Sequence, residues 1–172
     1  MMPDGPPGEF GHRFPPIDPR KAVLPRALAG LSQLLLTLVF IFGVSAALWT
    51  TSWPSNLSGL LGPNASSYGY LSVHVVLAII LVIVEIVLIA FVARLGRGPI
   101  LGMSIATFLL TVVAAIAGSL TLMQPAQPLY VLLMALAFLA AWTTNLFLTV
   151  RLRWMQRAAR WRSTHPTPPA AP

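Results

Sequence analysis

Four long apolar segments dominate the pattern of hydrophobic and polar positions along this chain. They cover residues about 27–50, 71–93, 99–123 and 129–150, and none of them contains Lys or Arg. About 20 residues are needed to cross a hydrocarbon core about 30 Å thick, so each segment is long enough to span a bilayer. Backbone amides inside lipid must be paired within the segment, which only helices achieve here. The sequence therefore predicts an all-α integral membrane protein.

The connections predict how these helices are arranged. Residues 94–98 and 124–128 are short, so each joins two antiparallel neighbours. Residues 51–70 form a longer, uncharged connection rich in Pro and Gly. We expect an antiparallel four-transmembrane-helix bundle built from two hairpins, occupying residues 27–150. Outside it we expect a disordered, Pro-rich tail over residues 1–26, and a basic juxtamembrane helix with a Pro-rich C-terminal tail over residues 151–172.

Charge is scarce and confined to certain segments. Charged residues make up 9% of the chain, whereas soluble domains carry about 25%. All 11 Lys and Arg residues precede the first segment, separate the second from the third, or follow the fourth. By the positive-inside rule this predicts a multi-pass protein with both termini in the cytoplasm, and the simple topology suggests a prokaryotic inner membrane. Basic residues that flank apolar spans do not indicate a nucleic-acid partner, because no soluble domain carries a basic face.

A cluster of arginines follows the fourth segment and continues its helical pattern. The cluster comprises Arg151, Arg153, Arg157, Arg160 and Arg162, with Trp154 and Trp161 among them. Arg and Trp together suit an anionic lipid surface, where each Arg contributes about 1 kcal/mol. The cluster also fits a plain topological anchor, or a docking site for other membrane subunits or for a second copy of the chain.

One ionisable acid, Glu85, lies inside a span. A charged carboxylate at that depth costs about 2.5–3.5 kcal/mol, so Glu85 should be protonated, paired or beside water. No Lys or Arg lies in any span, which excludes a buried ion pair. Counting to the same depth on the other helices predicts a polar layer with Gln33, Thr37, Thr107, Thr111, Thr143 and Asn145. This layer is either interhelical hydrogen bonding or a proton or ion site.

His74 lies near the outer end of the same predicted helix as Glu85. Eleven residues, about three helical turns, separate the two, so both should project from one face into the bundle. His74 is either an interfacial side chain or an axial haem ligand.

A family resemblance bears on that choice. The stretch Tyr70-Leu-Ser-Val-His74-Val-Val-Leu-Ala, after a loop with Ser52-Trp-Pro, resembles one four-helix half of haem A synthase and other small cytochrome-b-like membrane proteins. That resemblance implies a b-type haem and a second histidine on the fourth helix. This chain has Tyr130 and Met134 at the matching depth, so bis-histidine ligation fails and His74 with Met134 is the remaining pair.

The sequence contains no other recognisable catalytic or metal-binding motif. The chain has no cysteine, and it lacks a Gly-rich phosphate loop, paired carboxylates, a Ser-His-Asp set and a metal-ligand cluster. We therefore expect a membrane-embedded accessory or scaffold subunit without a cofactor, while leaving open whether it catalyses a reaction. The alternatives are an electron carrier with haem b at His74, and a proton or ion pathway through Glu85.

Overall fold

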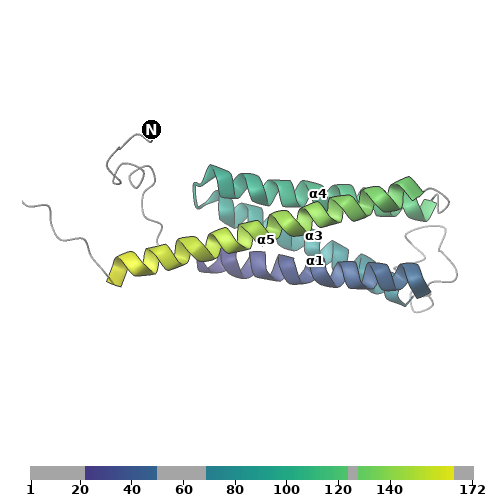
Figure 1. The fold of residues 1–172 in the computed structure, drawn as a ribbon, viewed down its shortest axis with the longest axis horizontal. Coiled ribbons are helices and arrows are strands. Elements are labelled where there is room, and N and C mark those ends of the chain that lie inside the picture. Colours follow the sequence, from purple (N-terminus) through teal and green to yellow (C-terminus); the bar gives the residue numbers. More distant parts are fainter. Residues whose placement is uncertain (1–21, 50–68, 124–127, 165–172) are drawn as a thin grey trace, which may run out of the picture.

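The structure, a computed structural model, describes residues 22–49, 69–123 and 128–164. Four helices account for nearly all of them: α1 (Val23–Trp49), α3 (Tyr70–Ala93), α4 (Gly98–Met123) and α5 (Pro128–Thr164) (Figure 1). No strand occurs in these ranges. The predicted all-α four-helix fold is confirmed. The proline-rich ends expected at residues 1–21 and 165–172, and most of the long connection at 50–68, lie outside the described residues.

The start of α1 differs from the sequence prediction, and the end of α5 agrees with it. Helix α1 begins at Val23 rather than at residue 27, and so includes Pro25. Proline is tolerated in the first turn of a helix because the N–H that it lacks would have no partner there. Helix α5 does not stop at residue 150 but continues without a break to Thr164, as its helical pattern suggested.

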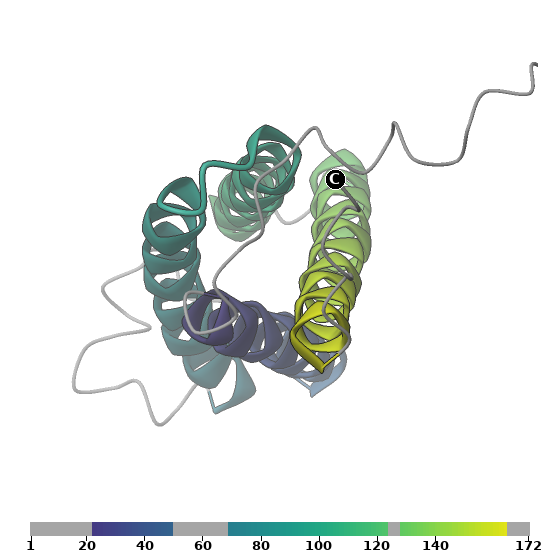
Figure 2. The ribbon, with the colours of Figure 1, turned by 90° about the vertical axis from the view of Figure 1, so that its left-hand side faces the viewer.

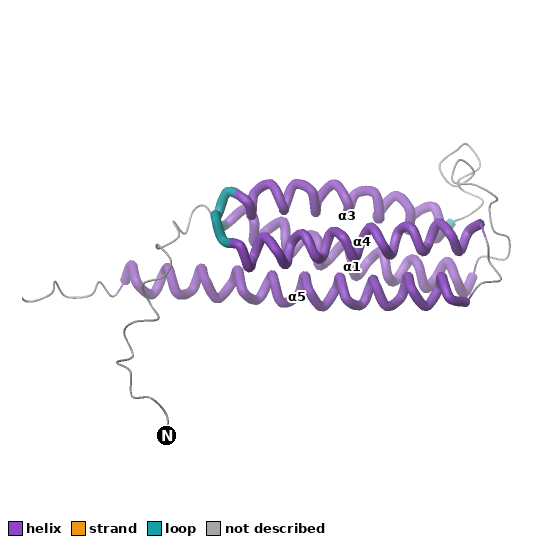
Figure 3. The backbone as a smooth tube through the Cα atoms, turned by 90° about the horizontal axis from the view of Figure 1, so that it is seen from above, coloured by secondary structure: helices purple, strands orange, loops and turns teal. Residues whose placement is uncertain are grey.

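A tight turn joins α3 to α4. The amides of Leu95 and Gly96 donate to the carbonyls of Val92 and Ala93, which closes the end of α3. Gly96 has a φ of +64°, in the left-handed region that glycine adopts without steric cost, so a glycine suits this position. The turn forces α3 and α4 to run antiparallel, as Figure 3 shows.

The four helices form a ring (Figure 2). The most extensive contacts are within two hairpins, α1 with α3 and α4 with α5. Smaller contacts between α3 and α4 and between α1 and α5 join the hairpins, while the backbones of the diagonal pairs α1/α4 and α3/α5 do not approach closely within the described residues. Two hairpins packed side by side are the arrangement that the loop lengths predict.

The outer surface of the bundle is apolar. Large side chains on every helix are more than half exposed, among them Leu34, Ile83, Leu109 and Phe147. All four helices are long and apolar enough to cross a membrane. The bundle is therefore apolar on its outside as well as on its inside. Such an outer surface is suited to contact with lipid and not with water.

The interior alternates between apolar and polar layers. One apolar cluster near the α3–α4 turn includes Leu88, Val92, Ile100 and Leu148, and a second cluster nearer the middle includes Leu36 and Leu81. Along α3, Glu85 lies between Leu81 and Leu88 and is 1% exposed. A polar layer is thus enclosed by apolar packing on both sides.

Candidate functional site: a buried polar layer

Glu85 of α3 lies where three helices meet. Its Oε1 accepts a hydrogen bond from the Thr111 hydroxyl of α4 at 3.0 Å, and a longer one from the Ser32 hydroxyl of α1 at 3.5 Å. All three side chains are buried. One carboxyl oxygen therefore links both helices of the first hairpin to the second hairpin.

A second set of hydrogen bonds joins α5 to α1. The Asn145 amide nitrogen donates to the Ala29 carbonyl at 3.2 Å and to Gln33 Oε1 at 3.0 Å. Because a backbone carbonyl can only accept, this bond fixes which atom of the Asn145 amide is the nitrogen. Both of its N–H groups are then used, and Gln33 must present its oxygen.

Four buried polar atoms in and next to this layer have no hydrogen-bond partner among the described residues. They are Glu85 Oε2, Gln33 Nε2, Asn145 Oδ1 and Thr149 Oγ1. Buried polar side-chain atoms in folded proteins are nearly always paired, so four such atoms within a single region are unusual. The layer therefore contains more buried donors and acceptors than its own hydrogen bonds use.

The structure brings most of the predicted layer together. Thr107 is buried, although its hydroxyl donates to the Met103 carbonyl of its own helix. Thr143 does not join, because its hydroxyl donates to the Leu139 carbonyl at 2.8 Å on a more exposed side of α5. Thr37 lies at the edge of the layer, where it accepts a hydrogen bond from Trp142 Nε1 at 3.3 Å.

Sequence reasoning missed three members of this region. Ser32 lies at the predicted depth, next to Gln33, and neither it nor Trp142 nor Thr149 belongs to the predicted set. Depth counting says how far along a helix a residue lies, but not which neighbour it faces. Adjacent residues project about 100° apart, so Ser32 can face α3 while Gln33 faces α5.

His74 also contacts α1, on the same side of α3 as Glu85. Its Nδ1 lies 2.7 Å from the Val39 carbonyl, which can only accept, so Nδ1 carries the proton and donates. The ring lies directly over Gly43: a Cβ built there would come within 2.8 Å of His74 Cε1. Gly43 thus allows α1 and α3 to approach closely at this point.

Met134, the other residue of the predicted haem pair, belongs to the second hairpin. Its sulfur lies against Gly118 of α4, 3.2 Å from where a Cβ of that glycine would be. His74 therefore contacts the first hairpin and Met134 the second, on two helices whose backbones do not approach closely within the described residues. Haem binding at His74 and Met134 stays a prediction.

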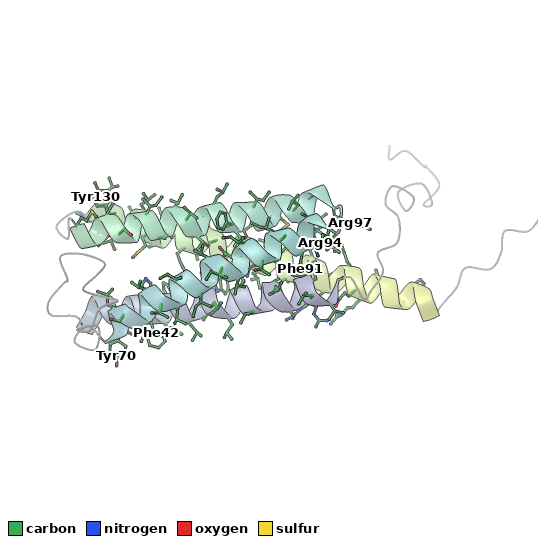
Figure 4. The ribbon with its side chains drawn as sticks, turned by 180° about the vertical axis from the view of Figure 1, so that it is seen from behind. Phe42, Tyr70, Phe91, Arg94, Arg97 and Tyr130 are labelled. Atoms are coloured by element: carbon green, nitrogen blue, oxygen red, sulfur yellow. The ribbon has the colours of Figure 1, made fainter. Side chains whose placement is uncertain are left out.

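The arginines gather at one end of the bundle. Figure 4 shows Arg94 and Arg97 at the end opposite to Tyr70 and Tyr130, and Figure 3 shows α5 extending past that same end. The described members are Arg26, Arg94, Arg97, Arg151, Arg153 and Arg157, which we call the basic end. The side chains of Arg160 and Arg162 lie outside the described residues.

The fold, the apolar exterior and the enclosed polar layer define a multi-pass, all-α membrane protein. Comparison of the chain with family models, with curated proteins and with solved structures finds no match.

Proposed function

We propose that this chain is a membrane-embedded accessory or scaffold subunit that is held at an anionic membrane face by the end of α5. The observation that carries the proposal is the α5 arm, residues 151–164, which is packed on the bundle at its base and extends beyond the other helices at its end (Figure 1). The end of such a helix presents exposed side chains to its surroundings, among them Trp154 and Trp161.

The α5 arm is anchored at its base. Leu152 is fully buried in the apolar cluster near the α3–α4 turn, and Gln156 is 5% exposed. The Gln156 side-chain oxygen accepts a hydrogen bond of 2.8 Å from the Arg26 guanidinium of α1. These contacts fix the direction of the arm, which supports a role in positioning.

The other side of the arm combines aromatic and basic groups. Trp154 and Trp161 are seven residues apart, so they share one face, and they are 70% and 63% exposed. Arg151, Arg153 and Arg157 are exposed beside them. Tryptophan and arginine at a helix end are the residues that interact with headgroups, and Arg is attracted to anionic lipids.

Orientation follows from the same distribution. Four spans place both termini on one side, and the basic end lies on that side. The positive-inside rule then supports a cytoplasmic location for both termini. An inner membrane of a prokaryote remains our expectation for the host membrane.

Native mass spectrometry tests the lipid contact. We expect the variant Arg151→Gln/Arg153→Gln/Arg157→Gln to retain phosphatidylglycerol on the order of 100-fold less well, because three arginines contribute about 3 kcal/mol in all. The matched control Arg13→Gln/Arg20→Gln/Lys21→Gln removes the same charge from the N-terminal segment and should retain the lipid. Equal losses in the two variants would mean that net charge, and not the arm, attracts the lipid.

Cross-linking in native membranes tests the subunit role. We expect species heavier than the 18.5 kDa chain, containing either other subunits or further copies of the chain. A chain that forms no cross-linked species above its own mass of 18.5 kDa in native membranes would contradict the scaffold proposal.

A further inference from the structure

We propose that Glu85, with Ser32 and Thr111, forms a binding site for an exchangeable monovalent cation, a proton or a sodium ion. This inference does not depend on the scaffold role, because it rests on the interior of the bundle and not on the α5 arm.

The first step concerns the unused carboxyl oxygen. Both hydroxyl donors approach Oε1, while Oε2 is buried and has no partner among the described residues. If the carboxyl is charged, Oε2 lacks a donor; if a proton sits on Oε2, that proton lacks an acceptor. A glutamate whose only role was to hold helices together would be expected to use both oxygens. Oε2 is therefore the carboxyl oxygen that is available to bind a cation.

The second step concerns charge. No Lys or Arg occurs in residues 27–93 or 98–150, so no cationic side chain of the spans can neutralise an ionised Glu85. On the elements packed against it, α1 contributes Ser32 and α4 contributes Thr111, neither of which is ionised. The other charged groups among the described residues of α1, α3 and the α3–α4 turn are Arg26, Arg94 and Arg97 of the basic end, and His74 lies three turns away in the opposite direction on α3. An ionised carboxylate at this depth is costly, so its charge must be compensated by a small mobile cation.

The third step selects the class of cation. The described residues contain no group of three or more His, Cys, Asp or Glu side chains that could hold a metal ion. Divalent cations such as Ca²⁺ and Mg²⁺ prefer several oxygen ligands with more than one negative charge among them. One carboxylate with two hydroxyls matches a single positive charge. Binding of a proton leaves a neutral carboxyl, and release returns the proton to water.

Infrared difference spectroscopy of the full chain in lipid nanodiscs tests the proposal directly. As the pH is raised in choline chloride, we expect the carbonyl band of one neutral carboxyl per chain to disappear reversibly, and this band to be missing from Glu85→Gln. The other acids, Asp4, Glu9 and Asp18, are retained in that variant, so the difference isolates Glu85. Replacing choline with sodium should move the transition if Na⁺ also binds, and should leave it unchanged if the site takes a proton alone.

A matched pair of variants tests the geometry. Thr111→Val removes the 3.0 Å hydrogen bond to Oε1 and should raise the stretching frequency of the Glu85 carbonyl. Thr107→Val makes the same substitution one turn away, at a buried threonine that bonds only its own helix, and should leave the frequency unchanged. If Glu85→Gln does not fold, ¹³C-labelled glutamate in Glu9→Gln protein identifies the Glu85 band.

Three results would overturn the proposal. The Glu85 band could persist at every pH at which the helical circular dichroism is native, which would make Glu85 a permanently neutral structural group. It could be missing throughout, which would make it permanently charged. An equal response to Thr111→Val and Thr107→Val would place the carboxyl elsewhere than at the three-helix junction.

Discussion

At the scale of single residues, one close approach between helices depends on a glycine and a histidine. Gly43 has no side chain, which lets the His74 ring lie against the backbone of α1 and donate to the Val39 carbonyl. Small residues allow close helix approach in membranes generally, and here the approach brings a specific hydrogen bond within reach. The sequence marks Gly43 as a small residue of this kind, but its partner is visible only in three dimensions.

Replacing Gly43 with alanine should destabilise the bundle by about 1–3 kcal/mol, because the new Cβ would meet His74 Cε1 at 2.8 Å. Unfolding by sodium dodecyl sulfate in mixed micelles measures the change in the free energy of unfolding. Gly30→Ala is the matched control on the same helix: a Cβ at Gly30 would meet nothing within 4 Å, so no destabilisation is expected. A similar loss in both variants would contradict the contact with His74.

At the scale of helices, the two contacts of α5 differ in character. Against α4, Met134 packs on Gly118. Against α1, hydrogen bonds recur along the interface: Arg26 with Gln156, Gln33 and Ala29 with Asn145, and Thr37 with Trp142. This interface joins the two hairpins and is the smaller of the two. Polar contacts therefore specify how one hairpin sits on the other where apolar packing is limited.

A double-mutant cycle between Gln33→Ala and Asn145→Ala should give a coupling free energy of about 0.6 kcal/mol, and at most about 1.7 kcal/mol, as other hydrogen bonds inside membranes do. The unfolding assay described above supplies the four free energies. Thr143→Ala serves as the control partner for Gln33→Ala, because the Thr143 hydroxyl bonds only its own helix. Coupling of equal size with Thr143 would show that the 3.0 Å bond between Gln33 and Asn145 does not carry the effect.

At the scale of the whole molecule, the basic, polar and aromatic groups of the bundle lie at different positions along its long axis. The basic end and the α5 arm lie at one end, Tyr70 and Tyr130 lie at the other, and the polar layer lies between two apolar clusters (Figure 4). In a membrane, this arrangement would place the start of α1, the end of α5 and the α3–α4 turn on one side.

Single-cysteine labelling tests that placement, and the chain offers a clean background because it contains no cysteine. We expect Ala93→Cys and Ser163→Cys to react with a membrane-impermeant maleimide only when the cytoplasmic side is opened. Ser55→Cys, in the long connection, should react from the outside in intact cells. Labelling of Ser55→Cys and Ser163→Cys from the same side would refute the four-span topology, and with it the depth assigned to Glu85.

The sequence alone determined the number of spans, their antiparallel order and the depth of the polar layer. These properties follow from length, hydrophobicity and loop length, because each helix in lipid must satisfy its own backbone before it meets a neighbour. The depth of Glu85 and of Asn145 could be counted along the chain, and the basic continuation of the last helix could be read from its pattern.

Only the tertiary structure decided which side chains meet. The rotation of each helix about its axis depends on packing against its neighbours, and a helix that is apolar on every face carries little periodic signal to indicate that rotation. The sequence therefore does not show that Ser32 faces Glu85, or that the Thr143 hydroxyl bonds its own helix and lies outside the layer. The lack of a hydrogen-bond partner for Glu85 Oε2 among the described residues is likewise visible only in the structure, because it depends on how three helices pack together.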